Sequence, residues 1–204
     1  MRVFIRDQAA RLENLLPEFR RRSLSFGEPS GLPTTAFQER VGPRFEDLRE
    51  LNLDFLFRYE IFPPRILKFF GEWQSEGRSM REGDVIVQQA IVPPCCCGLK
   101  LVFAVRVLSI THERNKVAFS YGTLDGHPET GVNEFSFVVR TNEIFAVVQT
   151  FARPAHILAR LLAPLFTNPY VRYCNRRAAR QMKSQFDSAN AQLVGLRHGA
   201  GKEW

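Results

Sequence analysis

The side chains best suited to acid–base chemistry gather in one short stretch of this 204-residue chain. Within ten residues it holds Asp125, His127, Glu129 and Glu134. A histidine beside carboxylates can transfer protons as a general acid or base, and such side chains can also hold a metal ion. The structural alternative is a loop in which they hydrogen-bond to the backbone. The catalytic candidates are therefore His127, Asp125 and Glu129, whereas one histidine without spaced His or Cys partners predicts no metal site.

The same stretch, Tyr121–Gly131, has the composition of a tight connection between two strands. Its three glycines can adopt positive φ, and Asp125-Gly126 is a common turn dipeptide. His127 precedes a proline and is therefore biased toward an extended backbone. These features predict a rigid loop at the rim of any cavity, with His127 hydrogen-bonded within the loop or to an adjacent helix.

Strands are expected on both sides of this loop. Six segments alternate apolar with other residues or are almost wholly apolar, as half-buried and buried strands do. The segments are 53–61, 84–92, 99–107, 117–121, 135–139 and 144–151. Because short breaks separate the last five, the sheet is expected to be antiparallel. Between the first two segments, the helical spacing of Ile66, Leu67, Phe70 and Trp73 predicts a helix.

Helices are also expected at both ends of the chain. Residues 1–22 have apolar residues at helical spacing, although Pro17 would kink a helix there. Residues 23–35 are rich in Ser, Gly and Pro, which predicts a linker. Residues 154–163 predict a short helix, and a longer one is expected from Asn168 to Phe186.

The long C-terminal helix is expected to be amphipathic. Its apolar stripe repeats every four residues and consists of Cys174, Ala178, Met182 and Phe186. Its opposite, basic stripe consists of Arg172, Arg176 and Arg180. We expect the apolar stripe to face the sheet and the arginines to face solvent.

The predicted fold class is α+β, with a curved antiparallel sheet of about six strands gripping the C-terminal helix. By fold analogy this is the helix-grip, START-like or Bet v 1-like architecture. The expected domains are a helical and linker extension at 1–50, a helix-grip domain at 51–190 and a flexible tail at 191–204. A ligand cavity between sheet and helix is expected to be lined by the helix stripe that contains Cys174 and by Phe55, Phe57, Trp73, Phe103, Phe119, Tyr121 and Phe137.

The loop also carries a family resemblance. It reads Y-G-T-L-D-G-H-P-E-T-G from Tyr121 to Gly131, and F-A-R-P and A-R-L-L-A-P follow from Phe151 and from Ala159. This run resembles uncharacterised protein family 0548, a domain of unknown function, over about Trp73 to Met182. Because no reaction is assigned to that family, the resemblance implies no catalytic residues.

Composition and charge narrow the possible classes. The chain has 45% hydrophobic and 24% charged residues, which excludes disordered and collagen-like classes. Its formal charge is +7, and the basic excess lies between Ile144 and Phe186. A one-sided basic segment can contact nucleic acid or an anionic membrane surface, or it can be a solvated helix face. Charges and prolines interrupt the most apolar window, so no transmembrane helix is expected.

The cysteines and the start of the chain indicate the compartment. Three of the four cysteines, Cys95, Cys96 and Cys97, are consecutive, which suits neither a disulfide framework nor the usual spaced zinc ligands; the fourth is Cys174. The first residues lack the apolar run of a signal peptide. We therefore expect a cytoplasmic protein with reduced thiols. No phosphate-binding glycine loop is present, and no cofactor is expected.

Three functions stay open on the sequence alone. The first is binding of an apolar or aromatic small molecule, or a lipid, between sheet and helix. Polar strand residues that point inward, with Arg58, Glu60, Gln88 and Arg106 as candidates, would then orient the ligand. The second is an enzyme of cyclase or hydrolase type that uses His127 and nearby carboxylates. The third is docking of the basic helix on a polyanion or membrane surface. The oligomeric state is open.

Overall fold

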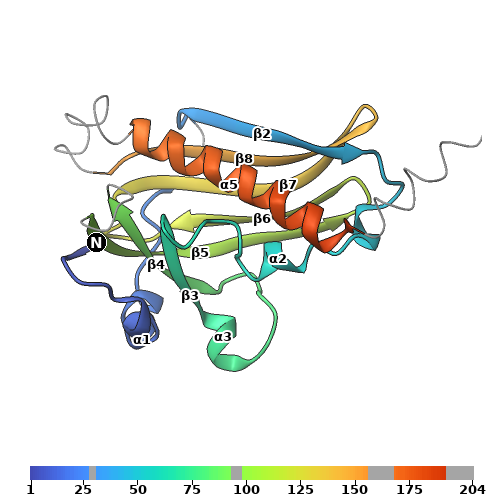
Figure 1. The fold of residues 1–204 in the computed structure, drawn as a ribbon. Coiled ribbons are helices and arrows are strands. Elements are labelled where there is room, and N and C mark those ends of the chain that lie inside the picture. The colour runs from blue at the N-terminus through green and yellow to red at the C-terminus, as the bar shows by residue number, and fades with distance from the viewer. Residues whose placement is uncertain (28–30, 93–97, 156–167, 192–204) are drawn as a thin grey trace, which may run out of the picture.

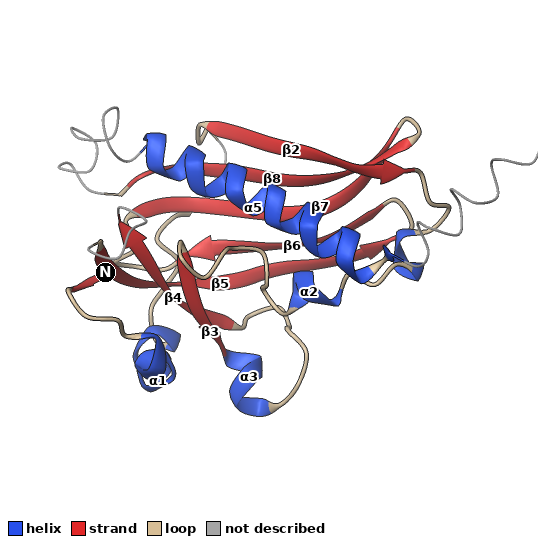
Figure 2. Ribbon diagram, in the orientation of Figure 1, coloured by secondary structure: helices blue, strands red, loops and turns tan. Residues whose placement is uncertain are grey.

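The computed structural model describes residues 1–27, 31–92, 98–155 and 168–191. A curved antiparallel sheet dominates, and α5 (Asn168–Ala189) crosses one face of it (Figure 1). The short helices α1 (Leu12–Arg20) and α3 (Glu72–Glu76) lie at the β3–β4 end of the sheet (Figure 2). The strands are β1 (Arg2–Phe4), β2 (Thr34–Pro43), β3 (Leu67–Gly71), β4 (Val85–Val92), β5 (Leu99–Glu113), β6 (Lys116–Thr123), β7 (Glu129–Arg140) and β8 (Glu143–Pro154).

The sheet has eight strands, and its hydrogen-bonded order is β2-β8-β7-β6-β5-β4-β3, with β1 paired to β5. Strands β4 to β8 follow one another as hairpins. This antiparallel meander with a C-terminal helix confirms the predicted α+β class, but the sheet has eight strands rather than about six. The turn of Arg114 and Asn115 joins β5 to β6, and Thr141 at φ 55° helps to join β7 to β8.

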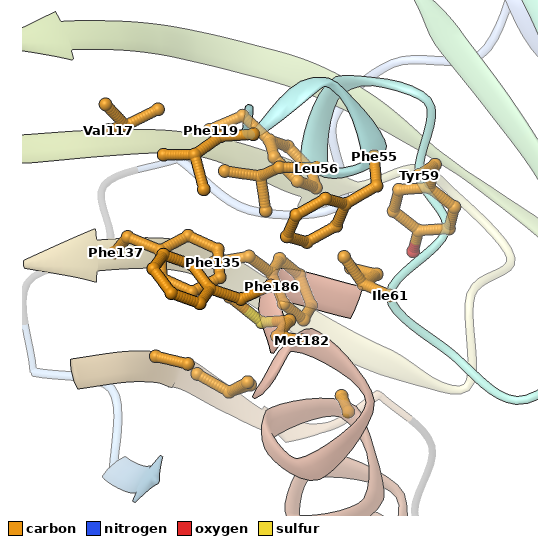
Figure 3. Close-up of a cluster of buried hydrophobic side chains, with 14 of the residues drawn as sticks. Phe55, Leu56, Tyr59, Ile61, Val117, Phe119, Phe135, Phe137, Met182 and Phe186 are labelled. Atoms are coloured by element: carbon orange, nitrogen blue, oxygen red, sulfur yellow. The ribbon is translucent and has the colours of Figure 1, made fainter. Parts of the chain in front are cut away.

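The inner face of the sheet, toward α5, carries an aromatic core. Side chains alternate along each strand, so Phe119 of β6 and Phe135 and Phe137 of β7 point the same way. The rings of Phe119 and Phe135 stack with centroids 5.3 Å apart, and Phe137 meets Phe186 of α5 at 5.5 Å. Figure 3 shows this cluster closed by Met182 from the helix. This part of the interior is therefore filled by protein.

A smaller core covers the outer face of the sheet. Leu12, Leu16 and Phe19 of α1 pack on Val85 and Val87 of β4, which alternate with the inward residues of that strand. Pro17 lies inside α1, one turn from its end, and the helix continues to Arg20. Helix α1 is therefore much shorter than the helix predicted over residues 1–22, because the segment before it forms β1 and a short 3-10 turn at Ala9–Arg11.

Two predicted elements near the middle of the chain are wrong. Residues 53–61 form no strand: α2 (Asp54–Phe57) lies within them, and Tyr59 then turns the chain at φ 63°. Phe55 and Leu56 are both buried, which a helical turn allows and an alternating strand does not. The helix predicted around Ile66 to Trp73 is replaced by β3 and the short α3, because β4 supplies a hydrogen-bonded partner for Leu67–Gly71.

The N-terminal quarter does not lie apart from the sheet. β1 pairs with β5, and β2 pairs with β8 along its whole length, so residues 1–50 supply two strands. The predicted linker over 23–35 thus runs into a strand that was missed. Edge strand β2 exposes alternate side chains, and only a few apolar residues such as Phe37 and Val41 reach the core. The helix predicted at 154–163 does not begin at Pro154, which ends β8, and the rest of it from residue 156 lies outside the described residues. The three consecutive cysteines, and the tail predicted at 191–204 from residue 192 on, also lie outside them.

Candidate functional site

A cavity of about 200 Å³ lies between the inner face of the sheet and the first half of α5. Its floor comes from β4, β5 and β6, its rim from the loop before β7, and its roof from α5. Most of its wall is apolar. Its lining includes Phe62, Gln88, Ala90, Leu101, Phe103, Tyr121, His127, Glu129, Asn133, Tyr170, Val171, Cys174 and Asn175.

The predicted site residues divide between this cavity and the core. Phe103, Tyr121, His127 and Glu129 line the cavity together. Asp125 does not: it is exposed at the turn and borders a separate, more polar hollow outside. Five residues predicted to line the cavity lie elsewhere: Phe55, Phe119, Phe137 and Trp73 in the packed core, and Phe57 against the ring of His112. The alternating pattern predicted which side chains of each strand point inward. It could not predict which of these pack in the core and which line the cavity.

The loop that carries His127 is fixed by the glycines predicted for it. Gly126 turns the chain at φ 82°. At Gly131 φ is 152°, and an added Cβ would lie 1.9 Å from the carbonyl oxygen of Phe151. The N–H of Gly131 donates to Oγ1 of Thr123, at 2.9 Å, and so ties the start of β7 to the end of β6. The loop is therefore braced at both ends and holds the following side chains in one place.

His127 is buried and bound to the backbone. Its Nδ1 lies 2.9 Å from the carbonyl oxygen of Glu129 and 3.0 Å from the backbone nitrogen of the same residue, so either tautomer is hydrogen-bonded there. The centroid of its ring lies 4.4 Å from that of the Phe103 ring, and the two rings pack in a T-shaped arrangement. Burial lowers the pKa of His127 to about 3, because the charged ring would lose its water. His127 is thus a neutral structural group at ordinary pH, and its predicted bonding within the loop matches this geometry.

Glu129 differs from its neighbour, because no described residue donates a hydrogen bond to its carboxyl group. The residue is half-buried at the cavity wall. Loss of water raises the pKa of Glu129 to about 7. Its charge in turn raises the pKa of Tyr121 and of Cys174, although burial is the larger cause for both. The carboxyl group therefore lies near Tyr121 on β6 and Cys174 on α5.

A polar network lies below the carboxyl group on the sheet. The side-chain amide of Gln88 donates to the hydroxyl of Tyr59 at 2.8 Å, and Tyr121 joins the same two groups. Burial raises the pKa of both tyrosines well above the ordinary value. Gln88 is almost fully buried, so of the polar strand residues considered for an inward role it is the one that points into the cavity. Arg106 instead contacts the carbonyl oxygens of Arg20 and Arg22 on the outer face.

The other side of the cavity is tied to α5 by a relay of three side chains. Asn175 donates to Oγ1 of Thr150 at 2.9 Å, and Thr150 donates to Oδ1 of Asn133 at 2.5 Å. These residues come from α5, β8 and β7. Because the relay is buried and internally satisfied, it fixes the height of the helix above the sheet at this point.

Helix α5 contributes cavity residues that the sequence analysis missed. Tyr170 donates from its hydroxyl to the carbonyl oxygen of Ile91 at 2.9 Å, and Val171 and Asn175 also line the cavity. Cys174, from the apolar stripe expected to face the sheet, lines the cavity too, and burial raises the pKa of its thiol to about 12. The signal available was spacing, because 170, 171, 174 and 175 share one face of a helix.

The basic stripe of α5 faces away from the cavity. Arg172, Arg176 and Arg180 are exposed, as expected. The guanidinium groups of Arg172 and Arg176 lie 5.8 and 5.9 Å from the ring centre of Phe37 on β2, and Arg180 forms an ion pair with Glu39 at 3.3 Å. Within the described ranges, no group of three His, Cys, Asp or Glu side chains could hold a metal, and no helix there is long and apolar enough to cross a membrane.

Comparisons with solved structures identify the fold. The KanY protein solved by NMR shares 9% identity at a TM-score of 0.51 and covers 77% of this chain and 99% of its own. The di-domain ARO/CYC StfQ from the steffimycin biosynthetic pathway shares 11% identity at a TM-score of 0.50, over 78% of this chain and 51% of StfQ. The chain thus matches about half the length of StfQ. A major latex-like protein from Panax ginseng also matches, with 13% identity, a TM-score of 0.41 and coverage of 76% and 99%.

At such identities the likeness concerns the fold alone, and it is consistent with the predicted helix-grip, START-like architecture. No curated protein sequence matches this chain. One protein family does match, over residues 23–185, a range that includes the glycine-rich loop, the cavity strands and most of α5. This confirms the predicted membership of an uncharacterised family: the chain belongs to the family described as "Domain of unknown function (DUF1990)".

Proposed function

We propose that this protein binds a small, mostly apolar molecule in the cavity under α5. The observation that carries the proposal is the cavity itself: apolar walls from the sheet and the helix enclose a few polar groups at fixed positions. Binding sites for small molecules have this composition, because apolar walls supply affinity and a few polar atoms set orientation. The braced loop and the Asn133–Thr150–Asn175 relay hold those polar groups in place before any ligand arrives.

The volume limits the ligand. A dry protein cavity of about 150 Å³ holds benzene, whereas sites for drug-sized molecules span about 300–1,000 Å³. At about 200 Å³ the space suits one ring with a short substituent. A polycyclic molecule or a long acyl chain would need the core residues around Phe119 and Phe137 to move, and these are packed. Single-ring molecules are therefore the favoured class over lipids.

An enzymatic function is the alternative. The geometry favours a different catalytic residue from the histidine that the sequence put first. His127 is bonded to the backbone and neutral, so it is a poor general base. Glu129 lines the cavity with a pKa near 7, which is the value that suits proton transfer at neutral pH. Of the three catalytic candidates, Glu129 is thus the one whose position and pKa suit proton transfer in the cavity. Binding is preferred because no second proton-transferring group with a pKa near neutral lines the cavity in the part of the chain that the structure describes.

Docking through the basic stripe of α5 is less well supported. Arg180 already pairs with Glu39, and Phe37 lies beneath the other two guanidinium groups. These contacts are those of a solvated helix face that covers an edge strand. A weak attraction to polyanions would still follow from the net charge.

The test of binding compares two phenylalanine substitutions on α5 by calorimetric titration with toluene. Val171→Phe fills part of the cavity, and Ser184→Phe adds the same ring at an exposed position of the same helix. We expect toluene to bind the wild type and Ser184→Phe equally, and Val171→Phe at least about tenfold more weakly, because the ring occupies its place. Toluene that binds all three proteins alike, or none of them, would contradict the proposal.

A further inference from the structure

Among the described lining residues, the carboxyl group of Glu129 is the sole formal charge. The lining includes no lysine and no arginine, and His127 stays neutral. The remaining titratable groups among the described lining residues are Tyr121 from β6, with Tyr170 and Cys174 from α5, and burial raises the pKa of all three. Their protons stay on through the neutral range. The cavity therefore contains one group that becomes negative near neutral pH, and no described cation there opposes it.

The carboxyl group of Glu129 also has no hydrogen-bond or ion-pair partner among the residues that the structure describes. Ion pairs elsewhere in the molecule show the contrast: Asp84 accepts two hydrogen bonds from Arg78, and Glu134, which is also half-buried, accepts one from Lys116 at 2.9 Å. No described residue does this for Glu129. A carboxylate at an apolar wall is stabilised most by a charged hydrogen-bond donor, because that replaces the water it has lost.

The walls near this carboxyl group suit a cation. Phe103 and Tyr121 present aromatic rings to the same cavity, and Phe62 and Tyr170 do so from other sides. An organic cation gains from aromatic faces as well as from the carboxylate. A carboxylic acid ligand would meet the like charge of Glu129 with no described basic side chain to pair with.

We propose that the cavity selects a small aromatic molecule that carries a primary amine, with Glu129 as the anchor for the ammonium group. The aromatic ring packs on Ala90, Leu101 and Phe103, and the ammonium group donates to the carboxylate. This assignment rests on the proposed binding function and adds the ligand's chemical class. No bond is made or broken, and Glu129 acts as a specificity-determining residue.

The experiment titrates three probes of one ring each, benzylamine, toluene and benzoate, into the wild type, Glu129→Gln and Glu134→Gln. Glu134 is the matched control, because it lies on the same strand, is also half-buried and does not line the cavity. Wild type and Glu134→Gln should bind benzylamine more tightly than toluene and benzoate most weakly. Glu129→Gln should lose roughly 10- to 100-fold for benzylamine, the range of a charge-assisted hydrogen bond, and little for toluene.

A second readout needs no substitution. Benzylamine affinity of the wild type should fall as the pH drops from about 8 to about 5, because Glu129 becomes protonated, whereas toluene affinity should stay level. The assignment fails if toluene binds but benzylamine gains nothing over it, or if Glu129→Gln and the pH leave that gain unchanged. If none of the probes binds, the binding function itself fails, and the ligand class fails with it.

Discussion

Nδ1 of His127 lies within 3.0 Å of both backbone polar atoms of Glu129. The imidazole ring at the cavity wall therefore also holds the backbone of Glu129, whose carboxyl group lines the same cavity. The two side chains are two residues apart and behave oppositely. The pKa of the histidine falls and that of the carboxyl group rises, both chiefly because burial disfavours charge. Near neutral pH the histidine is thus a fixed support and the carboxyl group is the responsive one.

Loss of the histidine should destabilise the fold. His127→Ala removes the hydrogen bond to the backbone of Glu129 and the ring contact with Phe103. We expect the free energy of unfolding to fall by about 2 kcal/mol, measured by urea denaturation. His112→Ala is the control, because His112 is exposed and only stacks on Phe57; it should change stability by less than about 0.5 kcal/mol. Equal effects of the two substitutions would contradict this role.

The pH dependence of stability should reveal the buried carboxyl group. The folded-state pKa of Glu129 is raised from 4.5 to about 7, so its contribution is present below pH 4.5 and is lost as the pH rises toward 7. The pKa of His127 is lowered from 6.5 to about 3, so its contribution is present above pH 6.5 and is lost as the pH falls toward 3. Between pH 4.5 and 6.5 the two effects oppose each other, and these two groups should leave the wild type nearly level.

Glu129→Gln separates the two contributions. Without the carboxyl group, stability should rise with pH through the window in which the wild type is level. Relative to the wild type, the variant should gain up to about 3 kcal/mol between pH 4.5 and pH 7, as the raised pKa requires. Chemical denaturation at a series of pH values measures this difference. Curves for the two proteins that run parallel would show that the folded-state pKa of Glu129 is ordinary.

The glycine at the start of β7 should tolerate no side chain. Gly131→Ala would place Cβ 1.9 Å from the carbonyl oxygen of Phe151, on neighbouring backbone that cannot move alone. We expect a loss of about 3 kcal/mol or more, or failure to fold, by thermal denaturation. Gly42→Ala is the control, since nothing lies within 4 Å of its added Cβ, and it should change stability little. A Gly131→Ala protein as stable as that control would refute the close approach.

The basic stripe and the cavity should be separable. Replacing Arg172, Arg176 and Arg180 with Gln should leave toluene affinity within about twofold, because these side chains point away from the cavity and their removal costs little packing. Retention on heparin should fall and should show a steep dependence on salt wherever it is present. A parallel loss of toluene binding would mean that the stripe positions α5 over the cavity.

The sequence was informative where one physical pattern dominated. Alternation along β4 to β8 and the stripe of α5 gave the sheet, its antiparallel order and the inward faces, because burial on one side imposes these periods. It failed at residues 53–61, where apolar residues at every second position came from a helical turn and a tight bend at Tyr59. The sequence did not predict β2. This edge strand is held by its hydrogen bonds to β8, and its own residues show no strong strand pattern.

The candidate site was predictable only in part, for a similar reason. His127, Glu129, Phe103 and Tyr121 were named from a loop motif and from strand faces, and they meet in the cavity. Which aromatic residues line the space and which fill the core depends on where α5 crosses the sheet. The relay through Thr150 sets that crossing, and it joins residues 25 positions apart in sequence. No local pattern carries this information.

The most direct test of the central claim is amide NMR of the isotope-labelled protein during titration with toluene. We expect the largest shift changes to map to residues around the cavity, namely Ala90, Leu101, Val171 and Cys174, and to saturate together. The packed core near Phe119 and Phe137 should change little. Shift changes that are absent, or that map to the outer face around α1, would contradict binding in the cavity under α5.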